Sequence, residues 1–127
     1  MSFCSILGIW CAVLSGPAIV SDGDTIRVQN QAIRLQGIDA EELKEPNGPG
    51  ARQALIRYTV GKIVECSDTG ERSYNRIVGV CKINGQDLGA IMVKTGYALD
   101  CERYSKGRYR SLEPADIRKR LTQKPYC

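Results

Sequence analysis

The sequence predicts a mainly β, α+β fold, in which a small barrel of five strands carries three helices on its outside. A chain of 127 residues has the length of one domain. Apolar residues make up 43% and charged residues 25%, which is the composition of a folded globule. Short strand-like segments bounded by turn residues are interleaved with segments of helical period, and this alternation favours a barrel covered by helices.

The first sixteen residues form an apolar leader, and we expect the folded domain to cover residues 17–127. Residues 3–14 are apolar apart from one serine. This stretch is too short to span a bilayer but has the length of a signal-peptide core. Because no Lys or Arg precedes it, the alternatives are a buried N-terminal strand or a misplaced start codon that hides the charged part. A removable leader predicts a secreted or periplasmic protein without a membrane partner.

Three strands are expected next, arranged as a meander around an Asp-Gly-Asp turn. They cover residues 18–21, 25–29 and 32–38, and the break between the last two is Asn30-Gln31. A loop rich in proline and glycine follows at residues 45–50. The apolar residues Ala51, Ala54, Leu55 and Tyr58 then keep helical spacing as far as Gly61.

The second half of the chain contributes a hairpin and two helices. We expect strands at 63–67 and 76–83, joined by a loop over 67–75. Asp87 is the expected N-cap of a helix that ends at Gly96. A last helix is expected from about residue 111 to 121, with Pro114 in its first turn, where the missing N–H does little harm.

The cysteines favour disulfides and export. If the leader is removed, four of the six cysteines remain: Cys66, Cys81, Cys101 and Cys127. An even number in a small domain is typical of a disulfide framework, and these four allow three pairings. None of them has the close Cys-x-x-Cys spacing that zinc sites use.

Charge is concentrated towards the C-terminus. Between Arg103 and Lys124, eight basic residues are opposed only by Glu113 and Asp116. A basic surface of this kind suits a polyanionic partner, although a solvated helix face has the same composition.

Acidic residues and arginines follow one another in an order that suits phosphodiester chemistry. Asp22-Gly23-Asp24-Thr25 comes first, Arg34-Leu35-Gln36-Gly37-Ile38-Asp39 follows, and Glu42 and Arg76 come later. Carboxylates can hold a hard divalent cation or orient a water molecule, and guanidinium groups can grip a phosphate. The sequence contains no histidine, which excludes nucleophile activation by histidine and most zinc sites.

This ordered set, with Tyr74-Asn75-Arg76 ahead of a strand, resembles the staphylococcal nuclease (thermonuclease) family from about residue 17 to 121. The resemblance implies an OB-fold barrel with three helices. It also implies a Ca²⁺-dependent endonuclease that hydrolyses DNA and RNA and leaves 3′-phosphate ends. Another divalent cation could replace Ca²⁺.

The resemblance also implies a role for each matching residue. The calcium ligands would be Asp24, Asp39 and the backbone carbonyl of Ala40, with Asp22 supporting the ion or its waters. Glu42 would bind the attacking water.

The remaining matches concern the substrate. Arg34 and Arg76 would contact the scissile phosphate and stabilise the transition state. Tyr74 would lie beside the bound nucleotide, and Tyr104 is a weaker candidate for the same contact.

Several positions depart from the family pattern, among them Asn75 in place of a glycine and the missing C-terminal tryptophan. Glu41 stands where the family usually has proline, which predicts a looser loop and an added carboxylate beside Glu42. Arg72 replaces an aspartate, so a local anchor is lost or replaced.

The cysteines offer compensating links. We expect Cys66 to pair with Cys81 across the second hairpin, and Cys101 to pair with Cys127. The second link would tie the C-terminal helix to the segment before it.

The expected partner is DNA or RNA, preferably single-stranded, bound by a monomer. Two alternatives stay open. One is an OB-fold barrel that binds nucleic acid but is catalytically weak or inactive. The other is a barrel that has been recruited to protein partners.

Overall fold

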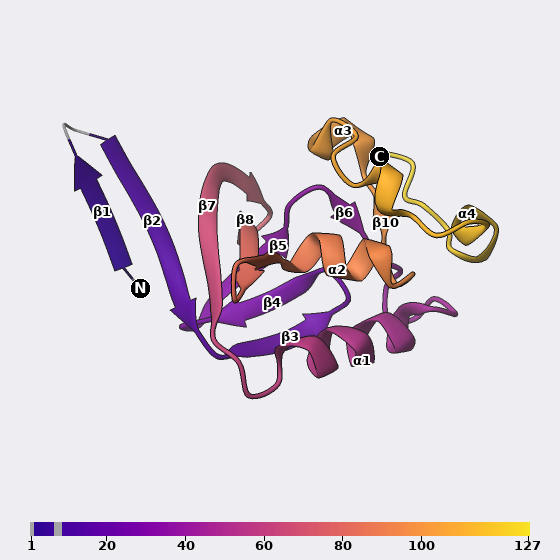
Figure 1. The fold of residues 1–127 in the computed structure, drawn as a ribbon, viewed down its shortest axis with the longest axis horizontal. Helices are drawn as coiled ribbons and strands as arrows, with labels where there is room; N and C mark the ends of the chain where they lie inside the picture. Colours follow the sequence, from indigo (N-terminus) through magenta and orange to yellow (C-terminus); the bar gives the residue numbers. More distant parts are fainter. Residues whose placement is uncertain (1, 7–8) are drawn as a thin grey trace.

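The computed structural model describes residues 2–6 and 9–127 (Figure 1). The strands are β1 (Ser2–Ile6), β2 (Ile9–Gly16), β3 (Ala18–Asp22), β4 (Thr25–Val28), β5 (Gln31–Leu35), β6 (Ile38–Asp39), β7 (Val64–Ser73), β8 (Arg76–Ile83), β9 (Gln86–Asp87) and β10 (Leu99–Asp100). The helices are α1 (Gly48–Thr59), α2 (Leu88–Lys94), α3 (Glu102–Ser105), the 3₁₀ helix η1 (Arg110–Leu112) and α4 (Ile117–Arg120).

The α+β fold class is confirmed, and its centre is one curved sheet. The strand order is β1-β2-β7-β8-β5-β4-β3, with β9 paired to β8. Strands β3, β4 and β5 form the expected meander, and β5 joins the second hairpin by a parallel pairing with β8. All five predicted strands are present. Within the described residues β1 and β3 stand at the two ends of the pairing order, so the sheet is not closed.

The N-terminal stretch forms a hairpin that projects from the body of the fold (Figure 1). Strand β2 continues into the main sheet by pairing Leu14 with Cys66 of β7, and Leu14 is buried in the core. A strand over residues 9–16 agrees with the alternative interpretation, in which this stretch is an N-terminal strand and not a leader. Residues 1, 7 and 8 of the predicted leader lie outside the described residues, and its removal stays a prediction.

The predicted strand over residues 32–38 is divided in two. Gly37 has a φ of 79°, a left-handed conformation that ends the sheet pairing after Leu35. Ile38 and Asp39 then turn away as β6 and pair with β10 in a separate two-stranded sheet. This turn directs Asp39 out of the main sheet.

The helices over the sheet match the sequence pattern well. Helix α1 packs against β3, and its Ala51, Ala54 and Leu55 are buried in the core, as their spacing predicts. Asp87 caps α2 by accepting hydrogen bonds from the backbone N–H groups of Gly89 and Ala90. No helix in the described part of the chain has the length and apolar character needed to cross a membrane.

The predicted continuous helix over residues 111–121 is wrong. Glu113 is extended because a residue that precedes proline is pushed away from the helical region. Asp116 has a φ of 65°, so the chain passes through η1 and a bend before the single turn of α4. The short helix α3, which follows Cys101, was not expected.

Both predicted disulfides are confirmed. Cys66 and Cys81 face one another across β7 and β8, and their sulfur atoms are bonded. Cys101 is bonded to Cys127, so the last residue of the chain is fastened beside the start of α3.

Candidate active site

A cavity of about 530 Å³ opens where the β3–β4 turn, β6 and the β7–β8 hairpin meet. Every side chain that the sequence predicted for the site lines it. These residues are Asp22, Asp24, Arg34, Asp39, Glu42, Tyr74, Arg76 and Tyr104. Ala40 is buried beside them and is not part of the lining, so its carbonyl as a ligand stays a prediction.

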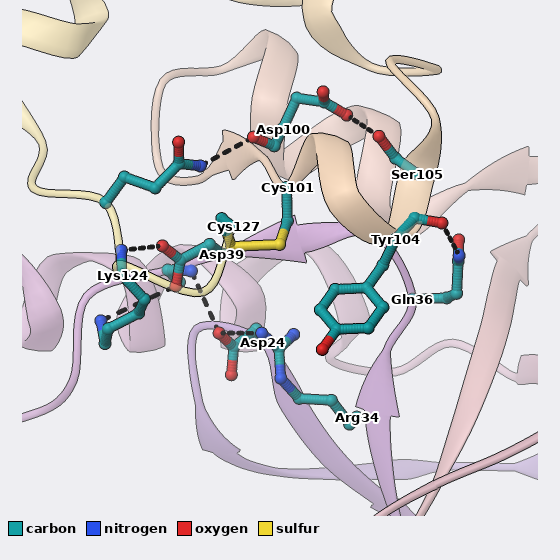
Figure 2. Close-up of a disulfide and its surroundings, with 12 residues drawn as sticks. Asp24, Arg34, Gln36, Asp39, Asp100, Cys101, Tyr104, Ser105, Lys124 and Cys127 are labelled. Carbon is teal, nitrogen blue, oxygen red and sulfur yellow. Dashed lines mark hydrogen bonds and ion pairs between the residues drawn. A yellow bond between two sulfur atoms is a disulfide. The ribbon is translucent and has the colours of Figure 1, made fainter.

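Asp24 is held in place by three neighbours. Its Oδ2 accepts a hydrogen bond from the backbone N–H of Ala40 at 3.0 Å and lies 3.4 Å from the Arg34 guanidinium (Figure 2). Its Oδ1 accepts a hydrogen bond from the Thr25 hydroxyl at 3.2 Å. The carboxylate therefore has a fixed orientation at the start of β4, next to an arginine.

Asp39 has one oxygen bonded and one oxygen free of hydrogen bonds. Its side chain belongs to β6, and the residue is only 3% exposed. Oδ2 accepts a hydrogen bond from the backbone N–H of Lys124 at 2.8 Å, whereas Oδ1 has no hydrogen-bond partner among the described residues. The Lys124 ammonium group lies 3.7 Å from Oδ1. Burial raises the pKa of Asp39, and a buried oxygen without a donor is a site where a cation would be stabilised.

Asp22 is the third aspartate of the cavity. Burial and then the proximity of Asp24 raise the pKa of Asp22 to about 6. The two neighbouring carboxylates form a region of negative potential, which favours a positive charge between them.

The two arginines are anchored from different strands. Arg34 lies on β5, where burial works to lower its pKa, but Asp24 and Tyr126 outweigh burial and raise it. Arg76 begins β8 and donates to the Ser73 carbonyl at 3.2 Å, the Ser73 hydroxyl at 2.8 Å and the Thr25 hydroxyl at 2.9 Å. These hydrogen bonds hold the Arg76 guanidinium group on the same cavity as Arg34.

Glu42 lies on the loop between β6 and α1, exposed at the cavity rim. Its backbone N–H donates to the Glu45 carboxylate at 2.6 Å. The first residue of α1, Gly48, packs closely on this loop. A side chain would not fit there, since a Cβ on Gly48 would lie 1.8 Å from the Glu42 carbonyl oxygen. In the described part of the chain the Glu42 carboxylate makes no hydrogen bond, which leaves it available to a water molecule.

Comparison with known proteins agrees with this geometry. Residues 32–123 match the family model described as staphylococcal nuclease homologue. The chain belongs to this family.

Several known proteins resemble the chain over most of its length. An uncharacterized endonuclease of Escherichia coli is 33% identical over 103 residues, covering 76% of this chain and 67% of that protein. A succinoglycan biosynthesis protein of Rhizobium meliloti is 30% identical over 110 residues, covering 77% and 58%. A staphylococcal-like nuclease of Arabidopsis thaliana is 32% identical over 95 residues, covering 74% and 29%. The chain therefore spans less than two thirds of the length of some of these relatives.

Glu41, which departs from the family pattern, tightens the loop instead of loosening it. It is 3% exposed and accepts hydrogen bonds from the backbone and side-chain amides of Asn47, at 3.0 and 2.9 Å. It also accepts one from the backbone N–H of Thr122 at 2.9 Å. These bonds outweigh burial and lower the pKa of Glu41. Because Glu41 is not part of the cavity lining, it adds no carboxylate to the site.

Arg72 replaces the missing anchor by an ion pair of its own. Its guanidinium lies 3.0 Å from the carboxylate of Asp68, four residues earlier on β7, and its side chain lines the cavity. Tyr74 stands at the tip of the same hairpin, 95% exposed and beside the Arg76 guanidinium.

Among the cavity residues that the sequence reasoning missed, two come from the end of the chain. Lys124 and Tyr126 lie in the last four residues of the chain, and both line the cavity. The ammonium group of Lys124 is 3.0 Å from the Glu45 carboxylate, in addition to its approach to Asp39. Cys127 was the feature of the sequence that could have indicated them, because its disulfide with Cys101 fixes the position of the segment that carries these side chains.

The predicted basic surface near the C-terminus is partly neutralised within the fold. Glu113 pairs with Arg118 at 2.7 Å and with Arg110 at 3.3 Å. Lys119 pairs with Asp116, and Lys124 turns into the cavity. The cavity also combines arginines with exposed aromatic rings.

The donor atoms that line the cavity are of the kind that a hard divalent cation binds. Carboxylate oxygens are the ligands that Ca²⁺ prefers, and Asp39 has an oxygen without a hydrogen bond. Across the described ranges 2–6 and 9–127, no three acidic or sulfur side chains are close enough to form a complete ligand set by themselves. A bound cation would therefore need further oxygen ligands and would meet the Lys124 ammonium beside Asp39.

Proposed function

We propose that this chain is a Ca²⁺-dependent endonuclease that hydrolyses phosphodiester bonds of DNA, RNA or both and leaves 3′-phosphate ends. One observation carries the proposal. The three aspartates, Glu42 and the guanidinium groups of Arg34 and Arg76 all line the same cavity. Membership of the staphylococcal nuclease family and relatives that are named nucleases support it.

The arginines act on the phosphate. A phosphodiester repels a nucleophilic water, so its negative charge has to be neutralised before attack. Two planar guanidinium groups held from β5 and β8 can each grip two phosphate oxygens. Because their hydrogen bonds within the fold fix them beforehand, they need little rearrangement when charge develops in the transition state.

Glu42 acts on the water. Its carboxylate stands at the rim of the cavity and makes no hydrogen bond with the described residues, so it can accept a proton from a water or orient it. Asp24 and Asp39 would hold the divalent cation with the Ala40 carbonyl, and Asp22 would support them. When bound, that cation supplies charge stabilisation for the phosphate and its leaving group.

The surroundings of the site favour a single-stranded substrate. The rings of Tyr74 and Tyr104 line the cavity and are partly or fully exposed, and exposed rings stack on unpaired bases. We propose that the protein acts outside the cytoplasm, either secreted or periplasmic, because its two disulfides favour an oxidising compartment. We also propose that it acts as a monomer.

A specific observation favours the binding-only alternative. The Lys124 ammonium lies 3.7 Å from Asp39, where it supplies part of the positive charge that a cation would bring. A barrel with this substitute charge could bind nucleic acid without cutting it. Cleavage assays separate the two functions.

The test uses oxidised protein, single-stranded DNA and RNA, and either Ca²⁺ or a chelator, with Glu42→Gln and Thr122→Ala alongside. Thr122 is the control because its exposed side chain is outside the cavity. We expect Ca²⁺-dependent cutting that Glu42→Gln lowers by a factor of about 10²–10⁴, the range typical of a general base, and that Thr122→Ala leaves unchanged. Intact substrate that is nevertheless bound, with salt-sensitive affinity, would favour the binding barrel.

A further inference from the structure

The C-terminal tail (residues 122–127) is hydrogen-bonded to the segment that carries the acidic residues of the cavity. The backbone N–H of Thr122 donates to Glu41 at 2.9 Å. The backbone N–H of Lys124 donates to Asp39 at 2.8 Å (Figure 2). Both acceptors belong to the segment that carries the acidic site. The tail therefore takes its position from the same loop that positions Asp39 and Glu42.

The end of the tail is locked by a turn and a disulfide. The backbone N–H of Cys127 donates to the Lys124 carbonyl at 3.1 Å, which closes a four-residue turn with Pro125 in its second position. Proline favours that position because its φ is already fixed. The bond from Cys127 to Cys101 then holds the turn beside α3. Tyr126 occupies the third position of the turn, so its backbone has little freedom.

The locked turn presents Tyr126 to the cavity. The Tyr126 side chain lines the cavity, and the residue is 46% exposed. Its phenol lies close enough to Arg34 to contribute to the raised pKa of that guanidinium. Tyr104, three residues after the other half of the disulfide, lines the same cavity. The disulfide thus brings two tyrosines from distant parts of the chain to one wall of the site.

An exposed aromatic ring beside a phosphate-gripping arginine matches the two halves of a nucleotide. The guanidinium suits the anionic phosphate, and the flat face of the ring suits an unpaired base, whatever its identity. A hydrophobic anchor for a protein partner would instead be surrounded by apolar side chains, whereas Tyr126 has Arg34 and Lys124 as neighbours in the cavity lining.

We propose that Tyr126 is a substrate-binding residue, which stacks on a nucleobase next to the cleaved phosphate and is held for that contact by the Cys101–Cys127 disulfide. This inference rests on the proposed nuclease function and names a subsite within it. The ring of Tyr126 therefore belongs to the binding surface for single strands.

The competing explanation is that Tyr126 only supports Arg34 through its hydroxyl group. Phenylalanine keeps the ring and removes the hydroxyl, so Tyr126→Phe separates the two roles. Thr122→Ala is the matched control, because it alters an exposed side chain of the same tail and leaves the backbone hydrogen bond to Glu41 intact.

The experiment measures kcat and KM for single-stranded oligonucleotides with Tyr126→Ala, Tyr126→Phe and Thr122→Ala. A companion measurement follows the binding of a fluorescent oligonucleotide to each variant in the Glu42→Gln background. We expect Tyr126→Ala to raise KM and Kd about tenfold, as loss of one stacking contact does, while kcat changes less than threefold. Thr122→Ala should match the wild type, and Tyr126→Phe, which keeps the ring, should lose much less affinity than Tyr126→Ala. An oligonucleotide series with one abasic position moved along the strand should contain one position at which wild type and Tyr126→Ala no longer differ.

Each other outcome overturns the inference. Unchanged KM and Kd in Tyr126→Ala, with a wild type that cuts normally, would remove Tyr126 from the substrate contact and leave the nuclease proposal standing. Equal losses in Tyr126→Phe and Tyr126→Ala would assign the effect to the hydroxyl and Arg34. A wild type that neither cuts nor binds nucleic acid would sink the proposed function itself, and the subsite with it.

Discussion

Removal of the two disulfides one at a time should separate stability from substrate binding. The Cys101–Cys127 bond has a sequence separation of 26 residues and the Cys66–Cys81 bond one of 15. With the loop-closure entropy of the unfolded chain, these lengths correspond to about 3.5 and about 3.0 kcal/mol of stability at 25 °C. We therefore expect Cys101→Ala/Cys127→Ala and Cys66→Ala/Cys81→Ala to lower the free energy of unfolding by nearly equal amounts. Alanine is chosen because Cys66, Cys81 and Cys101 are buried, and a serine hydroxyl there would need a partner.

Their effects on catalysis should differ. The Cys66–Cys81 bond joins β7 and β8 within the core, whereas the Cys101–Cys127 bond positions the C-terminal tail at the cavity. Urea unfolding gives the free energies, and KM for a single-stranded oligonucleotide, measured well below the unfolding midpoint, gives the effect on the site. We expect KM to rise several-fold only in the Cys101→Ala/Cys127→Ala variant. Equal rises in both variants would mean that KM follows general stability, and no rise in either would show that the site works without the fastened tail.

Two further predictions concern carboxylates of opposite pH behaviour. Glu41→Ala leaves two amides of Asn47 and the backbone N–H of Thr122 without their acceptor, so we expect a loss of about 3 kcal/mol by urea unfolding at pH 7. Because the pKa of Glu41 is lowered in the fold, this difference should persist above pH 4.5 and shrink as the pH falls through the lowered pKa; a constant difference would contradict it. Asp22→Asn, measured in the presence of a chelator, should change the free energy of unfolding in the opposite direction. The pKa of Asp22 rises from 3.8 to about 6 on folding, so its charge destabilises the fold increasingly from pH 4 to 6 and constantly above. After a discount for solvent screening we expect Asp22→Asn to be more stable by about 1–2 kcal/mol at pH 8 and equal to the wild type at pH 3, and an equal gain at both pH values would exclude Asp22 as the cause.

Local signals made the individual elements predictable. The cap at Asp87 and the glycine at position 96 bracket α2, and apolar spacing identified the buried face of α1. The Asp-Gly-Asp turn located the β3–β4 hairpin, and with it two of the cavity aspartates. The site residues themselves were recognised from the order of their motifs, and the fold brings their side chains to one cavity.

Long-range contacts could not be predicted in the same way. The pairing of β6 with β10 depends on a reversal at Gly37 and on a partner about 60 residues away, and no local pattern announces it. The role of Glu41 depends on Thr122, which the chain brings back only at its end. Pro114 suggested a helix start, but its effect on Glu113 decided the local structure.

The most direct test of the proposed catalytic site is the rate of single-stranded DNA cleavage as a function of free Ca²⁺, for the wild type and for Asp39→Asn. Asp39 offers a buried oxygen that has no hydrogen-bond partner among the described residues, so its carboxylate should contribute strongly to cation affinity. We expect the wild-type rate to rise to saturation with Ca²⁺ and to vanish in chelator. The Asp39→Asn curve should be shifted to at least tenfold higher Ca²⁺. A rate that is unaffected by chelator, or two curves that coincide, would contradict a calcium-dependent nuclease with Asp39 in its metal site.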